Sequence, residues 1–178
     1  ITCYGGLIIP PGTAFSVYNQ DNGDIPYTLN ISGDIDHSGN IYAEKENSKI
    51  LFNGSSVQNF NSTGTYSSIT GTAGISVLET DNPSGVNLTG NGTAVTKSII
   101  KTNGTFHIGD CFLELYGDIT RTNGYLGGNS NSELFIYGTG NAGNLYFESS
   151  ADSLKLLSMN RSSSGAINLA TNLYIDQS

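Results

Sequence analysis

Apolar residues along this chain recur in pairs spaced two positions apart, and the pairs themselves return after about twenty residues. Alternation with a period of two is the pattern of a β-strand that buries one face. Two interleaved series of such pairs run through the C-terminal half of the chain. One series is Leu113/Leu115, Leu134/Ile136, Leu154/Leu156 and Leu173/Ile175, and the other is Val86/Leu88, Phe106/Ile108, Leu145/Phe147 and Ile167/Leu169.

A longer period is superimposed on this one. The stretch from Ser32 to Gly54 aligns without a gap with the later stretch from Tyr116 to Gly138, and both share a Gly-Asp-Ile, an Asn-Ser, three apolar residues and a closing Gly. Self-similarity at a fixed spacing is typical of repeat architectures, in which each unit completes its core by stacking on a neighbour. We therefore expect one continuous structure of two long repeats and the start of a third. Their predicted ranges are 1–84, 85–164 and 165–178.

The two periods together predict an all-β protein, a parallel β-helix or β-solenoid with about 20 residues per turn, two to three sheets and nine turns. Asn-Gly dipeptides between the strands supply the positive φ angles that sharp corners need. The same dipeptides also form hairpins, so repeats of an antiparallel β-sandwich remain the alternative.

Composition and charge limit the classes of partner that the chain is expected to bind. With 23 Gly, 4 Pro and only 12% charged residues, the chain is suited to strands and turns. The net charge of −8 repels phosphate, so we expect no nucleic acid partner. No run of apolar residues is long enough to cross a bilayer, so the chain is not expected to be membrane-embedded.

The motifs that could carry chemistry have simpler interpretations. Gly138-x-Gly140-x-x-Gly143 matches a dinucleotide fingerprint, but an alternating strand follows it instead of a helix, which indicates a corner. Asp36 and His37 are interpreted as solvated residues at a corner, with His107 several turns away. Because carboxylates do not gather along the sequence, we expect no enzyme activity and no cofactor.

Two kinds of candidate site remain. Asp21 and Asp24 flank a glycine turn and offer the oxygen ligands that Ca²⁺ prefers, although a full site needs more oxygens and a polar loop is favoured. Sequons at Asn53, Asn91 and Asn103 are candidate N-glycosylation sites.

Neither end of the pattern has a polar cap of the kind that solenoids need. We therefore expect a slice of a longer protein, or a subunit whose ends join flanking repeats or neighbouring copies in a fibre.

The stretches "LFIYGTGNAGNLYF", from Leu134, and "SADSLKLLSMNRSSSGAINLATNLYI", from Ser150, resemble the tandem repeats of very large secreted surface proteins of Bacteroidota. The resemblance implies an extracellular location at the cell surface and a role as the shaft of an adhesin or filament, including adhesins used in gliding motility. It also implies O-glycans at Asp-Ser/Thr-apolar sites, and Ser153 in Asp152-Ser153-Leu154 fits that pattern.

The expected function is therefore structural: a repeat segment of an extracellular adhesin or filament. The alternative is a carbohydrate-binding or polysaccharide-degrading β-helix that contacts surface glycans, because tyrosine rings stack on sugars. In that case five tyrosines should line one groove, namely Tyr42, Tyr116, Tyr125, Tyr137 and Tyr146.

Overall fold

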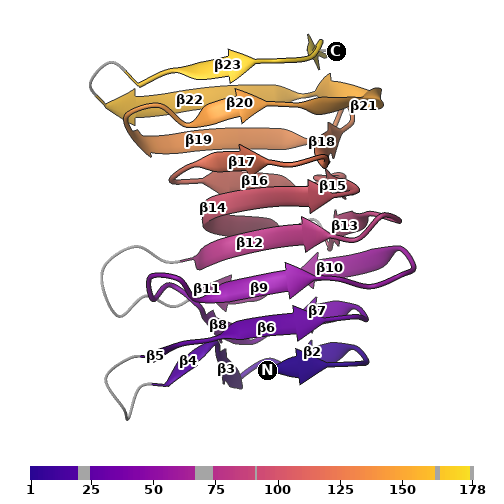
Figure 1. Ribbon diagram of the computed structural model, residues 1–178, viewed down its shortest axis with the longest axis vertical. Helices are drawn as coiled ribbons and strands as arrows, with labels where there is room; N and C mark the ends of the chain where they lie inside the picture. The colour runs from indigo at the N-terminus through magenta and orange to yellow at the C-terminus, as the bar shows by residue number, and fades with distance from the viewer. Residues whose placement is uncertain (20–24, 67–73, 91, 163–164, 177–178) are drawn as a thin grey trace.

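The computed structural model describes residues 1–19, 25–66, 74–90, 92–162 and 165–176. Within these ranges every regular element is a β-strand, and all strand pairs are parallel apart from one short hairpin, β4 (Tyr18–Asn19) with β5 (Ile25–Pro26). The strands wind around one axis, with the two termini at opposite ends of the stack (Figure 1). The prediction of an all-β parallel solenoid is confirmed, and the sandwich alternative is wrong.

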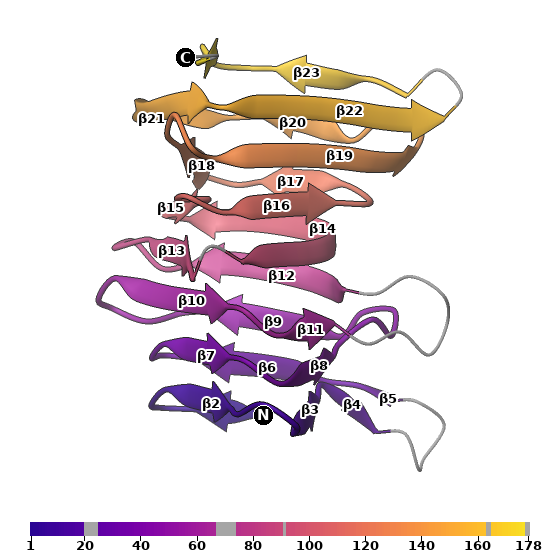
Figure 2. The ribbon, with the colours of Figure 1, turned by 180° about the vertical axis from the view of Figure 1, so that it is seen from behind.

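Three faces surround the axis. The first face is seen from the front in Figure 1, and Figure 2 shows β16, β19 and β22 of the third face stacked toward the viewer. The first face consists of β1 (Thr2–Cys3), β6 (Thr28–Ile31), β9 (Lys49–Phe52), β12 (Ile75–Asp81), part of β14 (Thr93–Asn103), β17 (Ile119–Arg121), β20 (Gly143–Leu145) and β23 (Ile167–Leu169). The second consists of β2 (Leu7–Ile9), β7 (Ile35–His37), β10 (Gln58–Ser62), β13 (Val86–Thr89), β15 (Thr105–His107), β18 (Tyr125–Gly128), β21 (Phe147–Leu154) and β24 (Tyr174–Ile175). The third consists of β3 (Ala14–Ser16), β8 (Asn40–Tyr42) and β11 (Thr65–Tyr66) and, farther along the axis, the start of β14, then β16 (Phe112–Leu115), β19 (Glu133–Thr139) and β22 (Leu156–Ser162).

The long strand β14 turns a corner and belongs to two faces. Its residues 93–96 pair with β16 on the third face, whereas its residues 99–101 pair with β17 on the first face. One strand therefore joins two ladders that are otherwise separate.

The register shows how long each turn of the coil is. Val86 pairs with Phe106, and Phe106 pairs with Leu126, so the turns in this part have the predicted length. Toward the N-terminus the turns are longer, since Leu7 pairs with Ile35, and Ile35 in turn pairs with Phe60. The described chain consequently makes fewer turns than the nine expected from a constant period.

A bulge in β21 changes the predicted series of apolar pairs. Leu113 pairs with Leu134 as expected, but Leu134 pairs with Leu157 rather than with Leu154. The reason is local. Leu126 and Gly128 are two positions apart on β18. Their pairing partners on β21, Phe147 and Asp152, are five positions apart, so β21 contains three additional residues. These residues shift the register of the strand pairs that follow.

Alternate residues of every face point inward and stack in columns. Leu29, Ile50, Leu78 and Ile99 form one such column on the first face, and all four are buried. Burying apolar side chains rung upon rung supplies the main driving force for the coil.

His37 corrects one interpretation made from the sequence. It is not at a solvated corner but points inward from β7, fully buried against Phe60 and Tyr66. Its Nε2 donates to the Thr65 carbonyl at 3.0 Å, and burial lowers the pKa of the imidazole. Because histidine is polar, the sequence pattern did not identify His37 as an inward-facing residue of the strand.

The corner predicted at Gly138 to Gly143 is confirmed, but the Asn-Gly prediction holds only in part: among the described Asn-Gly glycines, Gly104 has a positive φ angle, whereas Gly54, Gly92 and Gly124 do not. Gly138, Gly140 and Gly143 all have positive φ angles and lie at the turn from β19 to β20, so the dinucleotide-like string is a corner. Gly104 also has a positive φ of 72° between β14 and β15.

The last rung exposes apolar side chains on all three faces. Met159, Leu169 and Ile175 take the inward positions above Ile136, Leu145 and Leu154, which are all buried. Their own exposed fractions are 51%, 53% and 42%. We call these three residues the end triplet.

Candidate ligand-binding site

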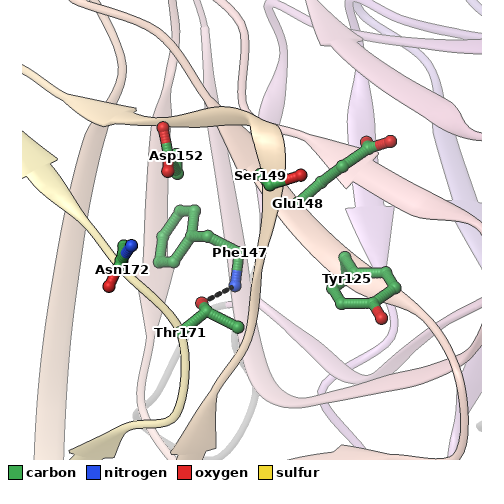
Figure 3. Close-up of a pocket in the computed structure, with 7 residues that line it drawn as sticks. All are labelled: Tyr125, Phe147, Glu148, Ser149, Asp152, Thr171 and Asn172. Carbon is green, nitrogen blue, oxygen red and sulfur yellow. Dashed lines mark hydrogen bonds between the residues drawn. The ribbon is translucent and has the colours of Figure 1, made fainter.

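The bulge in β21 opens a hollow of about 560 Å³ on the second face, which we call the upper hollow. Bulges interrupt strand pairing and re-aim side chains, and they are frequent beside functional sites. Figure 3 shows the residues around it, with Phe147 in the centre, Asp152 and Glu148 on the bulged strand and Thr171 below. The full lining is Tyr125, Phe147, Glu148, Ser149, Asp152, Thr171 and Asn172.

The segment before β24 closes one side of this hollow. The backbone N–H of Phe147 donates to the Thr171 hydroxyl at 2.7 Å, which ties this segment to the bulged strand (Figure 3). Phe147 itself is buried, whereas Ser149 and Asn172 are exposed at the rim. The hollow thus has an apolar floor and a polar edge.

Glu148 is held by residues of a strand two rungs away. Buried Thr105 donates its hydroxyl to Glu148 Oε2 at 2.8 Å, and His107 Nε2 lies 3.9 Å from the same oxygen. The rung between them carries Gly127, where an added Cβ would be only 2.3 Å from His107 Nδ1. The missing side chain at Gly127 is therefore what lets His107 lie across this rung.

A second hollow of about 350 Å³, the lower hollow, lies on earlier rungs of the solenoid and is lined mainly by residues of β13 and β15 and the segments that follow them. His107 lines it and also contacts Glu148 of the upper hollow, so the two lie next to each other along the solenoid axis. Asp110 lies at its edge and accepts hydrogen bonds from the amides of Asn129 at 3.0 Å and Asn131 at 3.2 Å.

The charge of both hollows is negative. Their linings contain three carboxylates, those of Asp110, Glu148 and Asp152, and neither lining includes a lysine or arginine among the described residues. Tyr125 forms an aromatic wall of the upper hollow, and Arg121 packs against it. The Arg121 guanidinium carbon lies 4.6 Å from the ring centre of Tyr125 and 4.3 Å from that of Tyr146. This contact fixes the Tyr125 ring in place.

The structure divides the five tyrosines that were expected to share a groove. Tyr125 and Tyr146 sandwich Arg121 at the corner between the first and second faces. Tyr116 and Tyr137 stack on the third face with their ring centres 4.9 Å apart. Burial, aided by the neighbouring Glu114, raises the pKa of Tyr116 to about 12.

Tyr42 lies in β8, near the other end of the third face, far from both pairs. Of the five, only Tyr125 lines either hollow.

The calcium and glycosylation candidates stay predictions. Asp21, Asp24 and Asn91 lie outside the described residues. Elsewhere in the described chain, no three His, Cys, Asp or Glu side chains are grouped closely enough to hold a metal ion. Asn53 is exposed after β9, whereas Ser153 is half-buried within β21, where it pairs with Tyr174.

Asn103 is half-buried, and its side-chain oxygen accepts from the Gly104 amide at 3.0 Å. The hydroxyl of its sequon belongs to Thr105, which is already bonded to Glu148.

Sequence reasoning missed the cluster of Thr105, His107 and Glu148. His107 was treated as isolated, because Glu148 is distant in the sequence and approaches it only through the stacking of two turns. One signal was available: the adjacent Gly127 and Gly128 interrupt a strand at the position where an outward side chain would block the contact.

Comparisons with known proteins return no relative. No protein-family model matches the chain, and neither the curated proteins nor the solved structures contain a match to it. Among the residues that the structure describes, no helix has the length and apolar character needed to span a bilayer. Inferences about function therefore depend on the geometry of the chain itself.

Proposed function

We propose that this chain is a structural repeat segment of an extracellular adhesin or filament at the cell surface, without chemistry of its own. The observation that carries the proposal is the parallel stacking of the rungs, in which inward apolar side chains form continuous buried columns such as Leu29, Ile50, Leu78 and Ile99. Stacking of this kind gives an elongated body in which each unit packs only on its neighbours. The partners proposed for it are flanking repeats of the same protein or neighbouring copies in a fibre.

The surface chemistry agrees with a shaft. Outward positions of the second face carry a ladder of amides, in which Asn59 bonds through its backbone and side chain to Asp34 and Asn87 approaches Asn59 at 3.5 Å. Such ladders join successive rungs and face water without offering a reactive group. Stiffness along the axis and a solvated surface are what an extracellular shaft requires.

The resemblance to Bacteroidota surface repeats supports the same assignment, with glycans at Ser153 or at the Asn sequons as part of it. Antibodies raised against the purified chain should label filaments on intact cells of the source organism. Labelling that appears only after the cells are permeabilised would contradict a surface location.

A catalytic role is tested separately. The purified chain should release no product from a panel of neutral and acidic polysaccharides. Reproducible turnover on any of them, lost in an inactive variant, would replace the structural assignment with the polysaccharide-degrading alternative.

A further inference from the structure

We infer that the upper and lower hollows together bind an extended, uncharged oligosaccharide on the second face. This inference goes beyond the shaft function and does not depend on it, because a shaft needs no concave surface. The two hollows are called the second-face groove below.

The size and shape of the groove fit a chain of sugars. Hollows of about 560 and 350 Å³ lie in the range of small-molecule sites. His107 of the lower hollow lies 3.9 Å from Glu148 of the upper hollow, so a ligand that fills both must be elongated along the solenoid axis. Successive rungs lie about 4.8 Å apart, which is close to the length of one sugar ring.

The lining combines the two kinds of group that recognise sugars. Tyr125 and Phe147 offer aromatic surface for the C–H face of a ring. Glu148, Asp152 and Asn172 offer carboxylate and amide groups for hydroxyls, and carboxylates form the stronger, charge-assisted hydrogen bonds.

Charge selects among sugars. Three carboxylates without a lysine or arginine in the described lining repel uronates, sulfates and phosphates. An uncharged glycan avoids the repulsion and still satisfies the carboxylates.

The groove is preorganised by features that a simple rod would lack. The three additional residues in β21 interrupt its regular pairing with β18, and the upper hollow lies at this interruption. The bond from buried Thr105 fixes Glu148 before any ligand arrives, which lowers the entropy cost of binding. Because Gly127 has no side chain, the His107 imidazole can lie across the rung between the hollows and approach Glu148.

The test is calorimetric titration of the whole chain with three probes: cellohexaose, N-acetylated chitohexaose and hexagalacturonate. We expect saturable binding of at least one of the two uncharged hexasaccharides, with a dissociation constant between about 1 μM and 1 mM, and none of the uronate. Absence of binding by both uncharged probes, or binding of the uronate alone, overturns the inference.

Variants locate the site. Tyr125→Ala should weaken binding at least about tenfold, since it removes an aromatic wall. Because Tyr125 also packs on Arg121, two milder variants, Asp152→Asn and exposed Asn172→Ala, test the same hollow without removing a packed ring. Each should weaken binding by about three- to tenfold.

The matched control is Tyr137→Ala on the third face, which removes a stacked tyrosine of the same type outside the groove. It should leave the affinity unchanged. If Tyr137→Ala abolishes binding while Asp152→Asn and Asn172→Ala leave it intact, the glycan binds the third face and the assignment is wrong.

Discussion

Lys101 is the residue whose environment departs most from its usual one. It points inward between Thr80 and Arg121 in one column, it is fully buried, and its ammonium nitrogen has no hydrogen-bond partner among the described residues. Burial, together with the positive charge of Arg121, lowers the pKa of Lys101 to about 7. A buried, unpaired ammonium destabilises the fold.

Replacing this side chain should therefore stabilise the protein. The unfolded pKa of lysine is about 10.4, so between pH 7 and pH 10 the unfolded chain binds more protons, and the stability of the native protein rises with pH. Lys101→Met should raise the free energy of unfolding at pH 7 by up to about 4 kcal/mol and remove this rise. Urea unfolding at pH 7 and pH 10 measures both effects. An unchanged pH dependence in the variant would show that Lys101 is not neutralised by burial.

Two buried amides fasten the corner between the first and second faces. Asn82 donates from Nδ2 to the Ser56 carbonyl at 2.7 Å and to Gln58 Oε1 at 3.0 Å, and Gln58 accepts from the Gly54 amide at 2.8 Å. Both side chains are buried. Leaving their partners unsatisfied costs more than the bonds contribute.

Asn82→Ala should accordingly lower the free energy of unfolding by about 3 kcal/mol, as measured by urea denaturation. Asn59→Ala is the control, because Asn59 is an outward, half-buried amide, and it should cost less than about 1 kcal/mol. Equal losses in the two variants would mean that the corner is not fastened in this way.

Among the elements, the corners decide where each strand ends. Gly104 combines a φ of +72° with a close backbone approach, since an added Cβ would lie 1.8 Å from the Asn82 carbonyl oxygen. Gly140 has a similar φ of +67°, but no atom lies within 4 Å of its Cβ position. Substitutions at these two glycines therefore separate the loss of stability caused by the positive φ angle from the loss caused by a steric clash.

Gly140→Ala should cost about 1 kcal/mol of stability, the penalty of a left-handed conformation. Gly104→Ala should cost at least about 3 kcal/mol, because the corner must also move away from Asn82. Thermal unfolding of both variants provides the comparison. Similar losses would show that stacking at the Gly104 corner is looser than the structure describes.

The elements also show what the sequence could predict. Period-two alternation at Val86, Phe106 and Leu113 depends on local burial, so it correctly identified parallel strands that stack turn upon turn. The bulge in β21 could not be identified, since "ESSAD" reads equally well as strand or turn. Because the upper hollow depends on that bulge, it could not be predicted either, and only Gly127 and Gly128 gave a sign of the contact between His107 and Glu148.

At the scale of the whole molecule, the end triplet should mediate association. Three exposed apolar side chains lie on one rung, whose strands have a ladder partner on one side only among the described residues, and this arrangement favours contact with another copy. The chain should therefore self-associate as its concentration rises. The triple variant Met159→Lys, Leu169→Lys and Ile175→Lys should reduce this without loss of stability, as measured by sedimentation velocity. Identical sedimentation of both proteins would exclude this surface.

The central claim is that the backbone returns to stack on itself in parallel register, and methyl-to-methyl nuclear Overhauser contacts in solution test it most directly. The structure predicts contacts between Leu113 and Leu134 and between Leu134 and Leu157, on neighbouring rungs of the third face. Absence of these contacts, with contacts instead between strands adjacent in sequence, as in an antiparallel sandwich, would contradict the solenoid and the functions argued from it.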